Sequence, residues 1–148
     1  MKYMGSKARI AKHILPIMLA ECEKHGITTW VEPFIGGGNM IDKVPDTFER
    51  IGYDNNKYLI EMYKELQEYG IQRFNHHIPK DLYDKVRNFY NGKDLTFKYN
   101  DSYVGWVGFM ASANGRFFDG GYSGISQTKV GTHRNYIEER IKGLAKGL

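Results

Sequence analysis

Cysteine and proline are scarce in this sequence, and their scarcity excludes several classes of protein. The 148 residues include one cysteine, Cys22, which cannot form an internal disulfide and fits a reducing compartment. Only four prolines occur, and no two of them are adjacent. The two neighbouring histidines, His76 and His77, do not form a Cys/His cluster with zinc spacing. A disulfide-stapled domain is therefore excluded, and we expect no metal site.

Long apolar runs are also missing. The best one, Ile14 to Ala20, is short and is interrupted by Pro16, whereas a membrane-spanning helix needs about 20 apolar residues. No segment has the pattern of a signal peptide. The sequence thus predicts a cytoplasmic protein that does not enter a membrane.

What remains is the composition of an ordinary globular chain. The length suits one domain with a real core, and 41% of the residues are hydrophobic. The formal net charge of +4 permits an acidic partner such as nucleic acid but does not require one.

One stretch organises the chain, from Thr29 to Asn39. A run of β-forming residues meets Pro33, and the consecutive glycines Gly36, Gly37 and Gly38 follow. This pattern predicts a strand, a tight loop and the start of a helix, because glycine lets the backbone turn sharply and approach a ligand closely. No Gly-Lys-Ser/Thr follows, so a P-loop is excluded. A purely structural turn is the alternative.

A second strand is expected over 49–53, and it ends at Asp54, eighteen positions after Gly36. Nucleotide-binding α/β units place a carboxylate on ribose hydroxyls at about this spacing. The two features together predict a site for an adenosine-type cofactor, and S-adenosylmethionine is the cofactor we expect there. The alternative for Asp54 is a helix N-cap, because a helix is expected to begin beside it.

Helical periodicity and turn residues predict the remaining elements. The first helix should be capped by Ser6 and run to about His25, with a stop at Gly26 and an apolar stripe of Ile10, Ile14, Ile17, Met18 and Cys22. Pro16 predicts either a kink in this helix or a division into two shorter helices. A short extended piece is expected over 71–74, and a loop or ribbon with little regular structure over 112–131. Further helices are expected over 39–43, 56–68, 81–90, 103–111 and 134–145.

Two other stretches carry chemical groups. The N-terminal residues 2–7 combine two lysines, Tyr3 and a Gly-Ser turn, so Lys7 could meet a carboxylate and the turn amides could face an anion; a solvated start is the alternative. The segment 109–124 holds arginine and aromatic residues among glycines, which can contact phosphates and stack on bases. A packed loop whose aromatics fill the core is equally compatible with its composition.

Several of these stretches together resemble the Dam-like class of DNA adenine-N6 methyltransferases. Lys2-Tyr3-Met4-Gly5-Ser6-Lys7 is similar to the family's N-terminal cofactor motif, and Glu32-Pro33-Phe34-Ile35-Gly36-Gly37-Gly38 to its Glu-Pro-Phe-x-Gly-x-Gly loop. Asp54-Asn55-Asn56 with Leu59-Ile60 resembles its second motif. The segment 108–122 resembles a later glycine-and-aromatic segment of phage and prophage members, and the stretch 83–91 resembles a helix of the family.

The resemblance implies a fold, a cofactor and a partner. The fold would be α/β, a partial Rossmann-like S-adenosylmethionine-dependent methyltransferase fold, with a cofactor-binding part over 1–70 and a helical and glycine/aromatic DNA-recognition part over 71–148. The setting would be the cytoplasm of a bacterium or a phage-infected host, with restriction-modification as a possible context. Double-stranded DNA would be the substrate, with the target adenine flipped out of the duplex and methylated on its exocyclic amine.

The resemblance also assigns residues. Those implied for the cofactor are Tyr3, Lys7, Pro33, Phe34, Gly36, Gly37, Gly38, Asp54 and Asn55. Those implied for DNA are Lys2, Asn114, Arg116 and Tyr122.

One part of the family pattern is missing. The catalytic motif Asp-Pro-Pro-Tyr needs two adjacent prolines, and this sequence has none. We therefore expect a fragment, one half of a split enzyme or a degenerate remnant, inactive alone, in which a second chain or self-association completes the sheet. The alternatives are a non-catalytic DNA-binding or regulatory protein that keeps the scaffold, and an adenosine-nucleotide-binding module unrelated to methylation.

Overall fold

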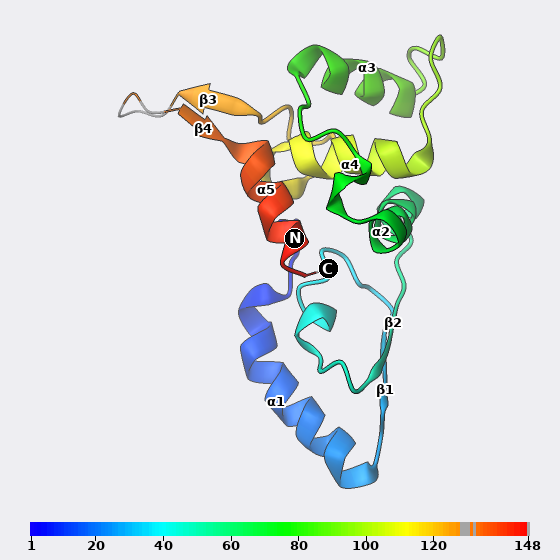
Figure 1. The fold of residues 1–148 in the computed structure, drawn as a ribbon, viewed down its shortest axis with the longest axis vertical. Coiled ribbons are helices and arrows are strands. Elements are labelled where there is room, and N and C mark those ends of the chain that lie inside the picture. Colours follow the sequence, from blue (N-terminus) through cyan, green and yellow to red (C-terminus); the bar gives the residue numbers. More distant parts are fainter. Residues whose placement is uncertain (128–130, 132, 148) are drawn as a thin grey trace.

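A computed structural model describes residues 1–127, 131 and 133–147. Figure 1 shows two parts that meet near the N-terminus. The first contains helix α1 (Ala8–His25), strands β1 (Thr29–Glu32) and β2 (Glu49–Gly52), and the short 3₁₀ turn η1 (Ile41–Lys43). The second contains helices α2 (Lys57–Tyr69), α3 (Lys80–Tyr90), α4 (Asp101–Ala111) and α5 (Tyr136–Ala145).

Helix α1 forms and ends as predicted, but its buried face differs. Gly26 closes it in the left-handed conformation with φ 64°. Pro16 lies inside the helix, which continues as one element instead of dividing into two. The predicted stripe is wrong: the buried positions are Ala11 and Leu15, whereas Ile17 is 70% exposed.

The reason lies in what α1 packs against. Ala11 and Leu15 are one turn apart and share a small core with Trp30 of β1 and with Met40 and Val44 of the following loop. Of the predicted stripe, only Ile14 packs against this core, whereas Ile10 and Met18 are 47% and 43% exposed.

Strands β1 and β2 confirm the two predicted strands. They pair in parallel, with Thr29 opposite Glu49 and Glu32 opposite Gly52. The pairing extends one step beyond the strands, since the Tyr53 amide donates to the Glu32 carbonyl (2.8 Å). The helix predicted over 39–43 is only the single turn η1.

Helix α2 begins one residue after the predicted start at 56, and Asn56 is its N-cap. The Asn56 side chain accepts from the backbone amides of Tyr58 and Leu59. Leu59, Met62 and Leu66, which recur at helical spacing in the sequence, are buried. After α2, the extended piece expected over 71–74 is wrong. The residues Ile71–Arg73 instead form the 3₁₀ turn η2, which the Arg73 amide closes on the Gly70 carbonyl (3.1 Å).

Helix α4 is the centre of the second part, and almost its whole length is buried. It lies against α2 so closely that a Cβ at Gly105 would stand 2.2 Å from the Tyr58 carbonyl oxygen. Helices α3 and α5 add Tyr83, Val86 and Ile141 to the same core. Ile137 and Leu144, which share the helical spacing of Ile141 in the sequence, are also buried.

The segment expected as a loop over 112–131 has more regular structure than predicted. It contains the 3₁₀ turn η3 (Ala113–Gly115), an isolated bridge between Ser112 and Tyr122, and strand β3 (Ile125–Gln127). Strand β3 pairs antiparallel with β4 (His133–Asn135), and residues 128–130 lie outside the described residues. The helix predicted from 134 starts later, at Tyr136, because Asn135 caps it by accepting from the Glu138 amide.

Over the described residues, no helix has the length and the apolar character needed to cross a membrane.

Candidate functional site

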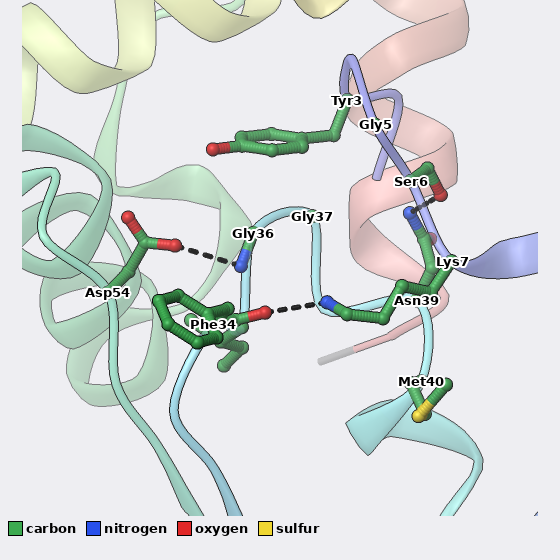
Figure 2. Close-up of a pocket in the computed structure, with 11 residues that line it drawn as sticks. Tyr3, Gly5, Ser6, Lys7, Phe34, Gly36, Gly37, Asn39, Met40 and Asp54 are labelled. Carbon is green, nitrogen blue, oxygen red and sulfur yellow. Dashed lines mark hydrogen bonds between the residues drawn. The ribbon is translucent and has the colours of Figure 1, made fainter.

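A cavity of about 330 Å³ opens where the N-terminal segment crosses the loop after β1 (Figure 2). Three separate parts of the chain form it: the residues before α1, the glycine loop, and the end of β2. The lining residues are Tyr3, Gly5, Ser6, Lys7, Phe34, Ile35, Gly36, Gly37, Asn39, Met40 and Asp54.

The glycines of the loop are required by the segment that packs on them. A Cβ at Gly37 would stand 2.7 Å from the Cβ of Tyr3 and 2.9 Å from the carbonyl oxygen of Met1. Gly36 has φ 50°, and a Cβ there would touch the ring of Tyr3 at 3.0 Å. The loop can therefore lie against the N-terminal segment only because it has no side chains at these two positions.

Asp54 links the ends of the two strands. Its Oδ2 accepts from the Gly36 amide at 3.1 Å (Figure 2). Its Oδ1 accepts from the Asn56 amide at 2.9 Å. The helix cap that was the alternative role for Asp54 belongs to Asn56. The carboxylate thus orders the loop and still lines the cavity.

Lys7 meets a carboxylate, as the sequence predicts, and that carboxylate is Glu32. The Lys7 ammonium donates to the Phe34 carbonyl (2.6 Å) and lies 3.4 Å from Oε1 of Glu32. Glu32 is 6% exposed, and its Oε2 has no hydrogen-bond partner among the described residues. The Lys7 ammonium therefore lies at the start of the glycine loop, next to the buried carboxylate of Glu32.

The amine of Met1 does not line the cavity but donates to two residues that do. The Met1 ammonium donates to the Gly37 carbonyl (3.1 Å) and to Oδ1 of Asn39 (2.7 Å). The Asn39 amide group donates in return to the Met1 carbonyl and to the Ser6 hydroxyl, each at 2.7 Å. Burial lowers the pKa of the Met1 amine. Sequence reasoning missed this role of Asn39. The only signal in the sequence was its position directly after the third glycine, since its side chain can both donate and accept hydrogen bonds.

The structure brings together most of the residues predicted for the cofactor. Tyr3, Lys7, Phe34, Gly36, Gly37 and Asp54 line one cavity. Pro33, Gly38 and Asn55 lie next to lining residues in the chain but do not line the cavity themselves. Phe34 is 70% exposed, so its ring stands free at the rim.

The residues predicted for DNA divide into two groups. Lys2, Asn114 and Arg116 are exposed and lie near one another, since a Cβ at Gly115 would stand 2.4 Å from the Lys2 carbonyl oxygen. The Arg116 Nε also donates to the sulfur of Met4 (3.3 Å).

Tyr122 is placed differently. Its ring lies 5.3 Å from that of Tyr83, and its hydroxyl donates to the Ile78 carbonyl (2.8 Å). Phe118 is buried, and Phe117 packs against the same core. For these aromatic residues the contacts favour the packed-loop alternative.

In the part of the chain that the structure describes, no three His, Cys, Asp or Glu side chains lie close enough together to hold a metal ion.

Comparison with known proteins adds a family to this geometry. The model of the D12 class N6 adenine-specific DNA methyltransferase family matches residues 3–104, which include Tyr3, Lys7, the glycine loop and Asp54. No curated protein and no solved structure gives a significant match. The matched span exceeds half of the 148 residues, and the chain therefore belongs to the D12 class of N6 adenine-specific DNA methyltransferases.

Proposed function

We propose that the cavity binds S-adenosylmethionine and that this chain is the cofactor-binding portion of a site-specific DNA adenine-N6 methyltransferase. The observation that carries the proposal is the convergence of Tyr3, Lys7, the glycine loop and Asp54 on one cavity. These residues come from three separated stretches, and a structural turn alone would not need them to converge.

The chemistry of the lining residues fits the parts of this cofactor. The Asp54 carboxylate would accept hydrogen bonds from the ribose hydroxyls. Lys7, Tyr3 and the loop from Pro33 to Gly38 would hold the methionine portion, with the Lys7 ammonium available to its carboxylate. When bound, the cofactor supplies the methyl group that is transferred to adenine.

The rest of the proposal concerns the fold and the DNA. The parallel pair β1–β2 would be one part of a Rossmann-like sheet, and residues 71–148 would contribute to DNA recognition, with Lys2, Asn114 and Arg116 toward the duplex. Because these 148 residues contain no Asp-Pro-Pro-Tyr, the groups that hold the adenine amine would have to come from outside them.

Calorimetry with S-adenosylhomocysteine tests the cofactor site. We expect micromolar binding by the wild-type chain and loss of binding in Asp54→Ala. Asp46→Ala is the matched control, because its side chain is 96% exposed in the same part of the molecule. Thermal unfolding of each variant would show that a loss of binding is not a loss of fold.

The other outcomes are equally informative. No binding by the folded wild-type chain would contradict a cofactor site that works in this chain alone. Equal affinity for other adenine nucleotides would favour a general adenosine-nucleotide module instead.

The missing catalytic motif favours a second candidate, a non-catalytic DNA-binding protein that keeps the scaffold. It predicts DNA affinity with a steep salt dependence and no effect of S-adenosylhomocysteine.

A further inference from the structure

The carboxylate of Glu32 is buried and only partly satisfied. Glu32 is the last residue of β1 and is 6% exposed. Its Oε1 lies 3.4 Å from the Lys7 ammonium, which is longer than a charge-assisted hydrogen bond usually is. Its Oε2 has no hydrogen-bond partner among the described residues. A buried carboxylate without adequate partners is costly, so Glu32 has the capacity for a further cationic donor.

This carboxylate lies immediately behind the wall of the cavity at the glycine loop. Glu32 does not line the cavity, but Lys7 and Phe34 do. The Lys7 ammonium makes its short hydrogen bond to the Phe34 carbonyl, at 2.6 Å, and only its longer contact to Glu32 (Figure 2). The Lys7 side chain is 35% exposed, and it is therefore the movable member of the pair.

A cation that enters this cavity meets acceptors that are largely in use. Both oxygens of Asp54 accept from backbone amides. Each carbonyl of the loop from 34 to 37 also accepts a hydrogen bond already: Phe34 from Lys7, Ile35 from the Gly38 amide (2.9 Å), Gly36 from the Tyr63 hydroxyl (2.7 Å) and Gly37 from the Met1 ammonium (3.1 Å). Oε2 of Glu32 is a charged acceptor beside the cavity that still has no donor among the described residues.

We propose that Glu32 accepts the α-ammonium group of the methionine portion of S-adenosylmethionine. The inference rests on the proposed function, which assigns this cofactor to the cavity, and it adds Glu32 to the residues that recognise it. An α-amino acid carries an ammonium and a carboxylate on one carbon, and Glu32 and Lys7 present the two opposite charges side by side. On binding, the Lys7 ammonium would turn to the ligand carboxylate, and the ligand ammonium would replace it at Glu32.

Calorimetry with two ligands tests this contact. One is S-adenosylhomocysteine, and the other is its analogue without the α-amino group, which keeps the adenosine and the carboxylate. We expect wild type to bind the analogue about tenfold more weakly, because a hydrogen bond between two charged groups is lost. Glu32→Gln keeps the shape of the side chain and should bind S-adenosylhomocysteine about tenfold more weakly than wild type does, with little preference between the two ligands.

The matched control is Glu49→Gln, at an exposed glutamate of β2 that does not line the cavity. It should prefer S-adenosylhomocysteine over the analogue as strongly as wild type does. Thermal unfolding of each variant reports whether it folds. If Glu32→Gln does not fold, the two ligands compared on wild type decide the inference, because equal affinities would overturn it.

Two further results would overturn the inference: unchanged binding of S-adenosylhomocysteine by Glu32→Gln, or weaker binding of both ligands by the same factor. The second result would show that the carboxylate acts only by holding Lys7. Wild type that binds neither ligand contradicts the proposed cofactor site, and the role of Glu32 falls with it. Binding of S-adenosylhomocysteine without any preference over the analogue keeps the cofactor site and removes only the role of Glu32.

Discussion

Tyr63 connects helix α2 to the glycine loop through a single hydrogen bond. Its hydroxyl donates to the Gly36 carbonyl (2.7 Å) from a position packed against the main core. Burial raises the pKa of Tyr63 well above its usual range, and the nearby Tyr3 and Asp54 add to the rise. The protonated hydroxyl is therefore the form that the folded protein stabilises.

We predict that Tyr63→Phe lowers the free energy of unfolding by about 1 kcal/mol at neutral pH, through loss of this hydrogen bond. Because the folded pKa is raised, the contribution of Tyr63 is complete below the unfolded pKa of about 10 and is lost as the pH rises above it. The difference between wild type and Tyr63→Phe should thus shrink above about pH 10.

Urea unfolding at neutral and alkaline pH measures this difference, with Tyr53→Phe as the control at a tyrosine that is 57% exposed. A difference that stays constant across the pH range would contradict the assignment.

At the level of residues, the sequence predicts the part of the site that depends on local pattern. Consecutive glycines after a strand and an acid after the next strand identify the loop and Asp54 without any structure. The pair of hydrogen bonds between Met1 and Asn39 could not be predicted, because these residues are 38 positions apart in the sequence and meet only in the folded chain. The partner of Lys7 was predictable as a carboxylate but not as Glu32, because the pair joins residues 25 positions apart in the chain.

Among the elements, those with caps and clear amphipathic stripes were predictable. Asn56 and Gly26 mark the boundaries of α2 and α1, and the buried face of α2 follows its sequence. The buried face of α1 does not follow its apolar stripe, because Ala11 and Leu15 form the small core with Trp30, whereas Ile17 stays exposed. Short elements such as η2 and β3 carry too few residues for a periodic signal.

The cap of α2 gives a prediction at this scale. Asn56→Ala should lower the free energy of unfolding by about 1 kcal/mol, because the amides of Tyr58 and Leu59 lose their acceptor. Asn55→Ala is the matched control, an exposed neighbour of the same type. Chemical denaturation measures both. Equal losses in the two variants would mean that the cap contributes nothing specific.

The whole molecule has two cores of unequal size. The larger joins α2, α3, α4 and α5, and the smaller lies between α1, β1 and the loop that follows β1. The sheet beside the smaller core has only two parallel strands in the described residues, and Val31 in β1 is 53% exposed. Parallel sheets are usually covered on both faces, and two strands alone are marginal, so the proposed Rossmann-like sheet would need strands beyond the two described here.

This incompleteness leads to a prediction about activity. With S-adenosylmethionine and unmodified double-stranded DNA, the pure chain should form no detectable N6-methyladenine, because none of its residues belongs to an Asp-Pro-Pro-Tyr motif that could hold the adenine amine. Addition of a chain that carries this motif and completes the sheet should restore methyl transfer, and Asp54→Ala should abolish the restored activity through loss of cofactor binding, while Asp46→Ala should leave it intact. Turnover by the pure chain would contradict the split arrangement and would require a different group within these 148 residues to orient the amine.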